Sequence, residues 1–168
     1  MEALFTLREW KQLPEGFPAQ LIDGCLIRDA APDFDHQDVV GEIYFRLRHL
    51  VDRRRVALSP ADVVIDRLNV LQPDVCVLRE PLRRGRHDVG IPLIAFEVLS
   101  PGTRKRDLGV KTVKLLAAGV EEVWLVDPVA RSISVRTTEG ARVFEASDVA
   151  CSTALPEVRL VLRELFAG

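Results

Sequence analysis

The chain has 168 residues, of which 48% are hydrophobic and 29% are charged, and its formal net charge is -2 with a pI near 6.0. This length and composition predict one globular domain with one substantial core, and the charge excludes a protein that coats nucleic acid by bulk positive charge. The three cysteines are too far apart in sequence for a metal-binding pair or a disulfide framework, which favours a reduced, cytoplasmic protein. No apolar run reaches the roughly 18 to 20 residues that cross a bilayer, and the N-terminus lacks a signal-peptide pattern.

The first third of the chain predicts two helices separated by a hairpin. Residues 5–12 carry apolar side chains at helical spacing before Pro14 ends the segment. Residues 20–27 are two apolar runs around Asp23-Gly24, which predicts a β-hairpin. From Asp35, a suitable N-cap, apolar residues fall on one helical face as far as Val51, and this helix is expected to end in the basic run 53–55.

The remainder predicts a mixed sheet interrupted by one helix. That helix is expected from about Arg106 to Gly119, largely buried, with only Asp107, Lys111 and Lys114 on a polar arc that points to solvent or into a cleft. The expected strands are residues 56–58, 62–66, 73–78, 91–99 and 122–127, followed by a hairpin around Glu139-Gly140 and an apolar C-terminal capping segment. The predicted fold class is therefore α/β, in one domain over residues 1–168.

Two acidic residues interrupt the most apolar strands. Asp74 begins one such strand and Glu97 lies near the end of the next, although Asp and Glu are rare in strands and rarely buried without a partner. Either acid alone is explained by an arginine or main-chain partner. Two of them on consecutive strands, followed by a lysine-bearing helix, favour a metal site.

This series of motifs resembles the PD-(D/E)XK nuclease superfamily and, within it, the Uma-two family of restriction-endonuclease-like proteins. The resemblance spans nearly the whole chain and rests on Leu21-Ile22-Asp23-Gly24, His36-Gln37, Gln72-Pro73-Asp74, Glu97-Val98-Leu99-Ser100-Pro101, Asp107 with Lys111, and Gly119-Val120 through Trp124 to Pro128. It implies a restriction-endonuclease-like αβββαβ core and a metal-dependent endodeoxyribonuclease activity.

The chain departs from the superfamily pattern at four positions. Leu99 stands where relatives usually carry lysine, and the resemblance places Lys111, on the following helix, in that role. Gln20 stands where relatives often carry Glu, and Leu115 and Val123 where they often carry Tyr.

The chemistry of these residues fits a hard divalent cation. Mg²⁺ or Mn²⁺ prefers oxygen ligands, which Asp74, Glu97 and the main-chain carbonyl of Val98 supply, whereas the three scattered histidines make a zinc site improbable. Lys111 is the candidate for orienting the attacking water and offsetting phosphate charge in phosphodiester hydrolysis. The candidate accessory residues are His36 and Glu42, expected to face the same cleft, and Asp107.

Three basic clusters are candidates for contacting DNA: residues 53–55, residues 83–86, and Arg104-Lys105-Arg106, the last of which directly follows the Glu97 strand. The alternative is that they are solvated loop charges. Two other readings of the whole protein remain beside the nuclease: a catalytically degenerate module that binds nucleic acid or protein, and a purely structural ion network. The sequence leaves the oligomeric state open, with a homodimer as one option.

Overall fold

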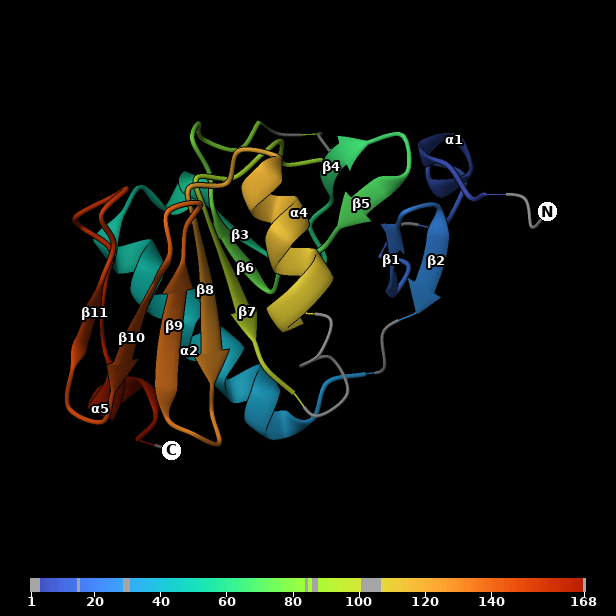
Figure 1. Ribbon diagram of the computed structural model, residues 1–168. Helices are drawn as coiled ribbons and strands as arrows, with labels where there is room; N and C mark the ends of the chain where they lie inside the picture. The colour runs from blue at the N-terminus through green and yellow to red at the C-terminus, as the bar shows by residue number, and fades with distance from the viewer. Residues whose placement is uncertain are drawn as a thin grey trace.

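A six-stranded mixed sheet forms the centre of the computed structural model and carries helices on both faces (Figure 1). The structure describes residues 4–14, 16–28, 31–83, 85, 88–100 and 107–167. The strand order is β10 (Ala141–Glu145), β9 (Ser132–Arg136), β8 (Glu122–Asp127), β7 (Ile94–Val98), β6 (Val75–Val77) and β3 (Val56–Leu58). Only the central β7 and β8 pair is parallel, and the other neighbours in this sheet run antiparallel.

One face of this sheet is covered by α2 (Phe34–Leu50), α5 (Leu162–Leu165) and the hairpin of β11 (Val149–Cys151) and β12 (Arg159–Val161). Val39, Ile43 and Leu47 recur about one turn apart along α2 and are the helix's buried residues. They pack against sheet residues that include Phe96, Trp124 and Val126, so this layer holds the larger part of the apolar core.

The opposite face is covered by the crossover between the parallel strands. It consists of η2 (Asp107–Lys111), a π-helical segment, which leads directly into α4 (Thr112–Ala117). A second sheet of order β2 (Cys25–Arg28), β1 (Ala19–Ile22), β5 (Asn69–Leu71) and β4 (Val63–Asp66) shares its apolar cluster with this face. In Figure 1 α4 lies in front of the large sheet, α2 lies behind it, and the small sheet lies to the right.

The N-terminal segment is fastened to the small sheet. The helix α1 (Leu7–Trp10) packs through Trp10 against Leu21 and Val70, and the Trp10 indole Nε1 donates to Asp62 Oδ2 at 2.8 Å. The β1 and β2 hairpin turns at Asp23-Gly24, whose φ angles of 50° and 75° match the type I′ turn that Asp-Gly favours.

The architecture confirms the predicted α/β class with its mixed sheet and both hairpins. Two expectations about α2 were wrong. Asp33, not Asp35, caps the helix, because its Oδ1 accepts from the main-chain N–H of His36 at 2.8 Å. The helix ends at Leu50, and residues 53–55 form a separate 3₁₀ turn, η1 (Arg53–Arg55), because Asp52 caps a new start by accepting from the Arg54 N–H.

The helix expected from residue 106 to Gly119 is also different in detail. It was expected to be largely buried, yet Leu108, Val110 and Val113 are 42%, 48% and 65% exposed. The π-helical turns of η2 hold more residues per turn than an α-helix, so they rotate the following side chains relative to a 3.6-residue pattern. Lys111 is the residue that becomes buried, at 3% exposed. None of the helices among the described residues combines the length and apolar character that would let it cross a membrane.

Candidate active site

Strand pairing brings the two predicted acids together. Val75 of β6 pairs with Phe96 of β7 in antiparallel register, so one further step along both strands places Asp74 beside Glu97. Side chains in such a position lie roughly 4.5 to 5.5 Å apart at their Cβ atoms. The turn residues Gln72-Pro73 end the ladder at this point, so both carboxylates lie at one end of the β6 and β7 pair.

Glu97 forms a buried ion pair with Lys111. The Lys111 Nζ donates to Glu97 Oε2 at 2.7 Å, and the two side chains are only 3% and 2% exposed. Nζ also donates to the main-chain carbonyl of Gln72 at 3.1 Å. The Lys111 ammonium is therefore buried and held against a site acid from another element.

Asp74 lies at the more open side of the group. Its Oδ2 accepts from the main-chain N–H of Val98 at 2.7 Å, and its side chain is 20% exposed. The other oxygen, Oδ1, accepts no hydrogen bond from the described part of the chain. The hydrogen bond to Oδ2 fixes the main-chain N–H of Val98, the residue after Glu97, against Asp74.

His36 joins the group from the first turn of α2. Its Nε2 lies 3.5 Å from Asp74 Oδ2, and the hydrogen bond to this carboxylate, with the charge of Asp74 and a main-chain contact to Val98, raises the pKa of His36 despite burial. The buried Nδ1 has no hydrogen-bond partner among the described residues. The Asp33 cap fixes the His36 main chain, so the helix start aims the imidazole at the acid.

A chain of polar groups from the small sheet supports Lys111, and it was not anticipated from the sequence. Gln20, 2% exposed, accepts from the Gln72 N–H through Oε1 at 3.0 Å, while the Gln72 side chain donates to Asp62 Oδ1 at 2.8 Å. Gln72 is thereby held at its N–H and its side chain, and its carbonyl meets Lys111. The signal in the sequence was Gln20 itself, a polar residue inside an apolar hairpin strand.

The other departures from the superfamily pattern lie in one place. Leu99, Leu115 and Val123 belong to the same apolar cluster between α4 and the large sheet. Leu99 is 8% exposed and the other two are fully buried. The usual lysine position is therefore packed with hydrocarbon, and the cation enters the site from the end of η2.

The structure does not bring every predicted residue to the site. The expectation that Glu42 faces the same cleft as His36 was wrong, because six residues along a helix turn the side chain by about 240° and Glu42 instead pairs with Arg46 at 2.6 Å. Of Asp107 only the main chain is described, as the first residue of η2, and Arg104, Lys105 and Arg106 lie outside the described residues.

The basic cluster at residues 53–55 is partly occupied by internal contacts. Arg54 pairs with Asp52 at 2.8 Å, and the Arg55 Nε donates to the Leu78 carbonyl at 2.7 Å. Arg55 therefore contacts the residue that follows β6, whereas Asp74 precedes that strand. In the second cluster, Arg84 and Arg86 lie outside the described residues.

The oxygen donors fit a hard divalent cation. Two carboxylates and the neighbouring Val98 carbonyl form a donor set of the kind that Mg²⁺ or Mn²⁺ accepts while keeping bound water. Within the described ranges, however, no three His, Cys, Asp or Glu side chains group closely enough to hold a metal by themselves. The carbonyl and water must therefore complete any coordination at Asp74 and Glu97.

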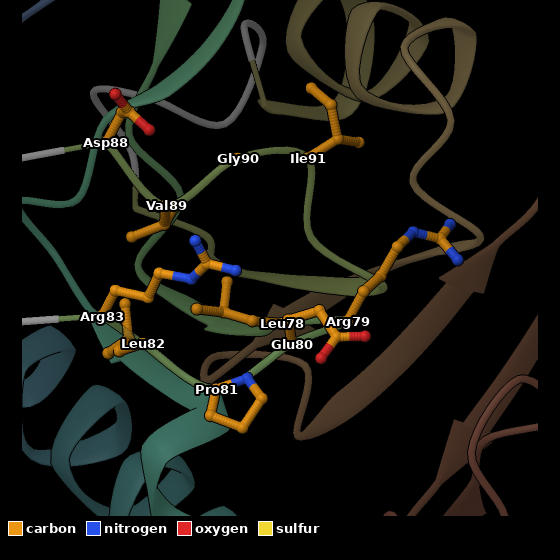
Figure 2. Close-up of a pocket in the computed structure, with 10 residues that line it drawn as sticks. All are labelled: Leu78, Arg79, Glu80, Pro81, Leu82, Arg83, Asp88, Val89, Gly90 and Ile91. Atoms are coloured by element: carbon orange, nitrogen blue, oxygen red, sulfur yellow. The ribbon is translucent and has the colours of Figure 1, made fainter. Parts of the chain in front are cut away.

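A hollow of about 320 Å³ lies away from this group (Figure 2). It is lined by residues 78–83 and 88–91, which belong to the connection between β6 and β7. Asp74 and this hollow are at opposite ends of β6. Arg79, which lines it, pairs with Glu121 at 2.9 Å.

Comparison with known families assigns the chain to one of them. Residues 6–164 match the family model Uma2, described as "Putative restriction endonuclease". The chain belongs to the Uma2 family. The match covers all of Asp74, Glu97, Lys111 and His36, and it confirms the resemblance seen in the sequence.

The fold of this Uma2 protein also matches a solved structure. The crystal structure of a putative nuclease belonging to DUF820 from Anabaena variabilis ATCC 29413 superposes with a TM-score of 0.82 at 24% identity, over 97% of this chain and 98% of that chain. At that identity the match establishes a shared fold. A search of curated proteins found no match.

Proposed function

We propose that this Uma2 protein is a divalent-metal-dependent endodeoxyribonuclease that hydrolyses phosphodiester bonds, with Asp74, Glu97 and Lys111 as its catalytic residues. The observation that supports this most strongly is the Lys111 to Glu97 contact of 2.7 Å. The lysine comes from a crossover segment fourteen residues further along the chain, yet it reaches the acid that strand pairing places beside Asp74. Two acids that can hold a divalent cation and one lysine that can offset phosphate charge thus lie at the end of one strand pair, an arrangement suited to phosphodiester hydrolysis.

Asp74, Glu97 and the Val98 carbonyl would hold Mg²⁺ or Mn²⁺. The bound ion supplies charge neutralisation of the scissile phosphate and a water of lowered pKa. Asp74 is prepared for this role because Oδ2 is held by the Val98 N–H, while Oδ1 is left for a ligand.

Lys111 has the position to orient a water at the site and to offset negative charge on the phosphate. A cation in a site that excludes bulk water acts more strongly on nearby charge than the same cation in solvent. Its burial at 3% exposed and its two hydrogen bonds, to Glu97 and to the Gln72 carbonyl, fix the ammonium in one place. His36 holds Asp74 in orientation through Nε2.

Substrate binding and assembly complete the proposal. Arg104, Lys105 and Arg106 directly follow the strand that carries Glu97, so they are our candidates for contacting DNA phosphates. We place the protein in the cytoplasm, as its cysteine usage favours. A homodimer is part of the proposal because a two-fold pair of sites matches the two antiparallel strands of a duplex.

Cleavage of supercoiled plasmid DNA in Mg²⁺ or Mn²⁺ tests this function. Wild type should nick or cut the plasmid, Asp74→Asn and Glu97→Gln should each abolish cleavage, and Lys111→Ala should lose turnover while metal still binds. Lys114→Ala is the matched control, since Lys114 pairs with Asp23 at 2.6 Å rather than with a site acid. Equal trace cleavage by wild type and all four variants would show contamination and end the nuclease reading.

A catalytically inactive module that binds nucleic acid is the second candidate. It is favoured by the apolar packing around Leu99, at the usual lysine position, and by the closed ion pair of Lys111 with Glu97. The same assay separates the two functions: DNA that shifts in a gel with wild type but is never cut in either metal supports the binding module.

A further inference from the structure

The outward side of α2 carries two phenylalanines that nothing in the described chain covers. Phe34 is 87% exposed and Phe45 is 59% exposed. They are eleven residues apart, which is close to three full helical turns, so they lie on one line opposite the buried residues Val39, Ile43 and Leu47. Figure 1 shows α2 behind the large sheet, with α4 on the other face. Two exposed aromatic side chains on one line of a helix make this face a candidate interaction surface.

The gap between the two rings is occupied by Gly41. It lies in the middle of α2, is exposed, and would place a Cβ in open space. Glycine in a helix interior is unfavourable relative to alanine, so α2 gains nothing from it by itself. What glycine provides here is a shallow place on the helix surface at which another helix can approach closely.

Charge along the same face is divided between its two halves. Asp35 and Asp38 lie in the N-terminal half, and Arg48 and His49 lie in the C-terminal half. A second α2 in parallel orientation would bring acids to acids and bases to bases. An antiparallel second copy pairs opposite charges and also opposes the two helix dipoles. The acids also disfavour nucleic acid as the occupant, since they repel phosphates.

We propose that this face of α2, formed by Phe34, Asp38, Gly41, Phe45, Arg48 and His49, is the contact surface for a second copy of the chain, packed as an antiparallel helix pair. The inference concerns assembly and does not depend on catalysis.

One register brings together Phe45, Gly41, Asp38 and Arg48, and it places Phe34 level with residue 52 of the second copy, just past the end of its α2. If Phe45 of each copy lies level with Gly41 of the other, the two-fold axis passes at residue 43. Residues 38 and 48 are equally distant from residue 43, one on each side. Asp38 therefore lies level with Arg48 of the second copy, and His49 is one residue further on. The ring fills the space that glycine leaves, and the charges meet at both ends.

The side chains are already held in place for such a contact. Arg48 stacks on Tyr44 with 5.3 Å from the guanidinium carbon to the ring centroid and donates to the Tyr44 hydroxyl at 3.0 Å. The rings of Phe45 and His49 are in contact at 4.5 Å between centroids. Side chains fixed before association lose less conformational entropy on binding.

The apolar area is in the range that a dimer needs. A buried aromatic side chain removes roughly 150 to 250 Å² from water. Since Phe34 and Phe45 are 87% and 59% exposed, the four phenylalanines of a pair supply roughly 440 to 730 Å², about a quarter to a half of the about 1,600 Å² of a standard interface. The rest must come from the polar rim of α2.

Sedimentation equilibrium over a wide range of protein concentration tests this surface. Wild type should form dimers, and Phe45→Ser should weaken dimerisation about tenfold or more. The control is Val113→Ser, an equally apolar exposed residue on α4, at the opposite face of the sheet, which should leave dimerisation unchanged. A wild type that stays monomeric throughout, or dimers unaffected by Phe45→Ser, would overturn the proposal.

Four further variants guard against a folding defect. Gly41→Leu places a good helix former in open space, so the monomer should melt no lower than wild type while dimerisation is lost. Asp38→Arg and Arg48→Asp should each weaken the dimer, and the double variant should restore it, which misfolding cannot imitate. A double variant no tighter than the single ones would exclude the antiparallel register, and weakened DNA binding by Phe45→Ser when wild type is itself monomeric would assign the face to nucleic acid instead.

Discussion

Lys111 is held by groups from two different sheets. Its ammonium meets Glu97 on the large sheet and the carbonyl of Gln72, whose N–H is in turn bound by Gln20 on the small sheet. Gln20 accepts from the Gln72 N–H, so we treat it as a positioning residue that acts on the ammonium through the main chain of Gln72. Without this hydrogen bond the main chain at Gln72 can shift and carry its carbonyl with it, and small displacements of a catalytic group cost large factors in rate.

Gln20→Leu should therefore lower turnover more than it weakens substrate binding. Removing the acceptor leaves the Gln72 N–H unsatisfied in a buried place, which costs about 1 to 3 kcal/mol in stability. The main chain at Gln72 would then hold Lys111 less firmly, so kcat should fall about ten- to a hundredfold with little change in KM. Gln20→Glu, which keeps an oxygen at this position, is the control and should retain most of the activity; equal losses in both variants would mean that the amide group matters in another way.

At the scale of elements, the start of α2 determines where His36 lies. Asp33 binds the His36 N–H, and His36 then approaches Asp74, so one cap connects helix formation to the site. Asp35, the residue that the sequence favours as the cap, instead lies in the first turn of the helix. The two aspartates differ by two positions and offer a direct comparison.

Asp33→Ala should destabilise the protein by about 1 kcal/mol, as loss of a helix cap typically does. Asp35→Ala should cost about 0.3 to 1 kcal/mol at most, because it removes only a favourable charge near the helix N-terminus. Urea unfolding of both variants, with the same m-value as wild type, measures the difference. If Asp35→Ala proved the more destabilising, the helix would begin later than the structure shows.

The sequence predicted the elements whose apolar pattern is long or punctuated by strong turn residues. Examples are the Asp23-Gly24 hairpin and the two strands predicted to carry Asp74 and Glu97. β5 was not separated from its neighbours, because three residues between turns carry too little period-2 signal. The burial of Lys111 was also not predictable from spacing, because a π-helical turn changes the phase and an ion pair with Glu97 offsets the cost of burial.

The candidate site divides in the same way. Asp74 and Glu97 were selected as candidates from the sequence because acids in apolar strands need an explanation. Strand pairing in the structure places them together. The prediction for Glu42 was wrong because it was based on nearness to His36 in sequence, whereas the direction around the helix decides what a side chain faces. Gln72 acts through its main-chain carbonyl, and a carbonyl leaves no mark in the sequence.

Across the whole molecule, Glu122 fastens the large sheet to the C-terminal segment. It is 1% exposed and lies at the start of β8, where its oxygens accept from the Trp124 indole, from Arg142 and from the Thr153 N–H and hydroxyl. Burial alone raises the pKa of this carboxyl, but the hydrogen bonds from Trp124, Ser152 and Thr153 outweigh it and leave the pKa lowered. The charged form is therefore the one that the fold stabilises.

Glu122→Gln should destabilise the protein by about 2 to 4 kcal/mol near neutral pH, since charge-assisted hydrogen bonds are lost and an amide N–H₂ meets other donors. Because the folded pKa lies below the unfolded value, wild type holds this stability above the unfolded pKa and loses it as pH falls through the folded one. The difference in free energy of unfolding between wild type and variant, measured by denaturant unfolding, should accordingly become smaller toward low pH. Glu121→Gln, at an exposed ion pair with Arg79, should show little change at any pH.

Metal binding should act on the stability of the entire fold, and its sign distinguishes a metal site from a structural ion network. Without a divalent metal ion, Asp74 still lies beside Glu97, whose charge Lys111 offsets, and the two carboxylates repel each other; Asn at 74 can still accept from the Val98 N–H. In EDTA, Asp74→Asn should thus be as stable as wild type or more so. In Mg²⁺, wild type should gain RT ln(1 + [L]/Kd), about 2.7 kcal/mol at a hundredfold excess over Kd, and the variant much less.

Asp62→Asn provides the contrast for those thermal melts. Asp62 is a structural acid that accepts from Trp10 and Gln72, so its variant should be destabilised equally in EDTA and in Mg²⁺. If Asp74→Asn behaved like Asp62→Asn, and wild type showed no metal-dependent shift in Tm, the acids at the end of β6 and β7 would be structural. The polar chain from Trp10 to Lys111 would then serve only to hold the two sheets together, because the same contacts that position a catalytic lysine also join the sheets.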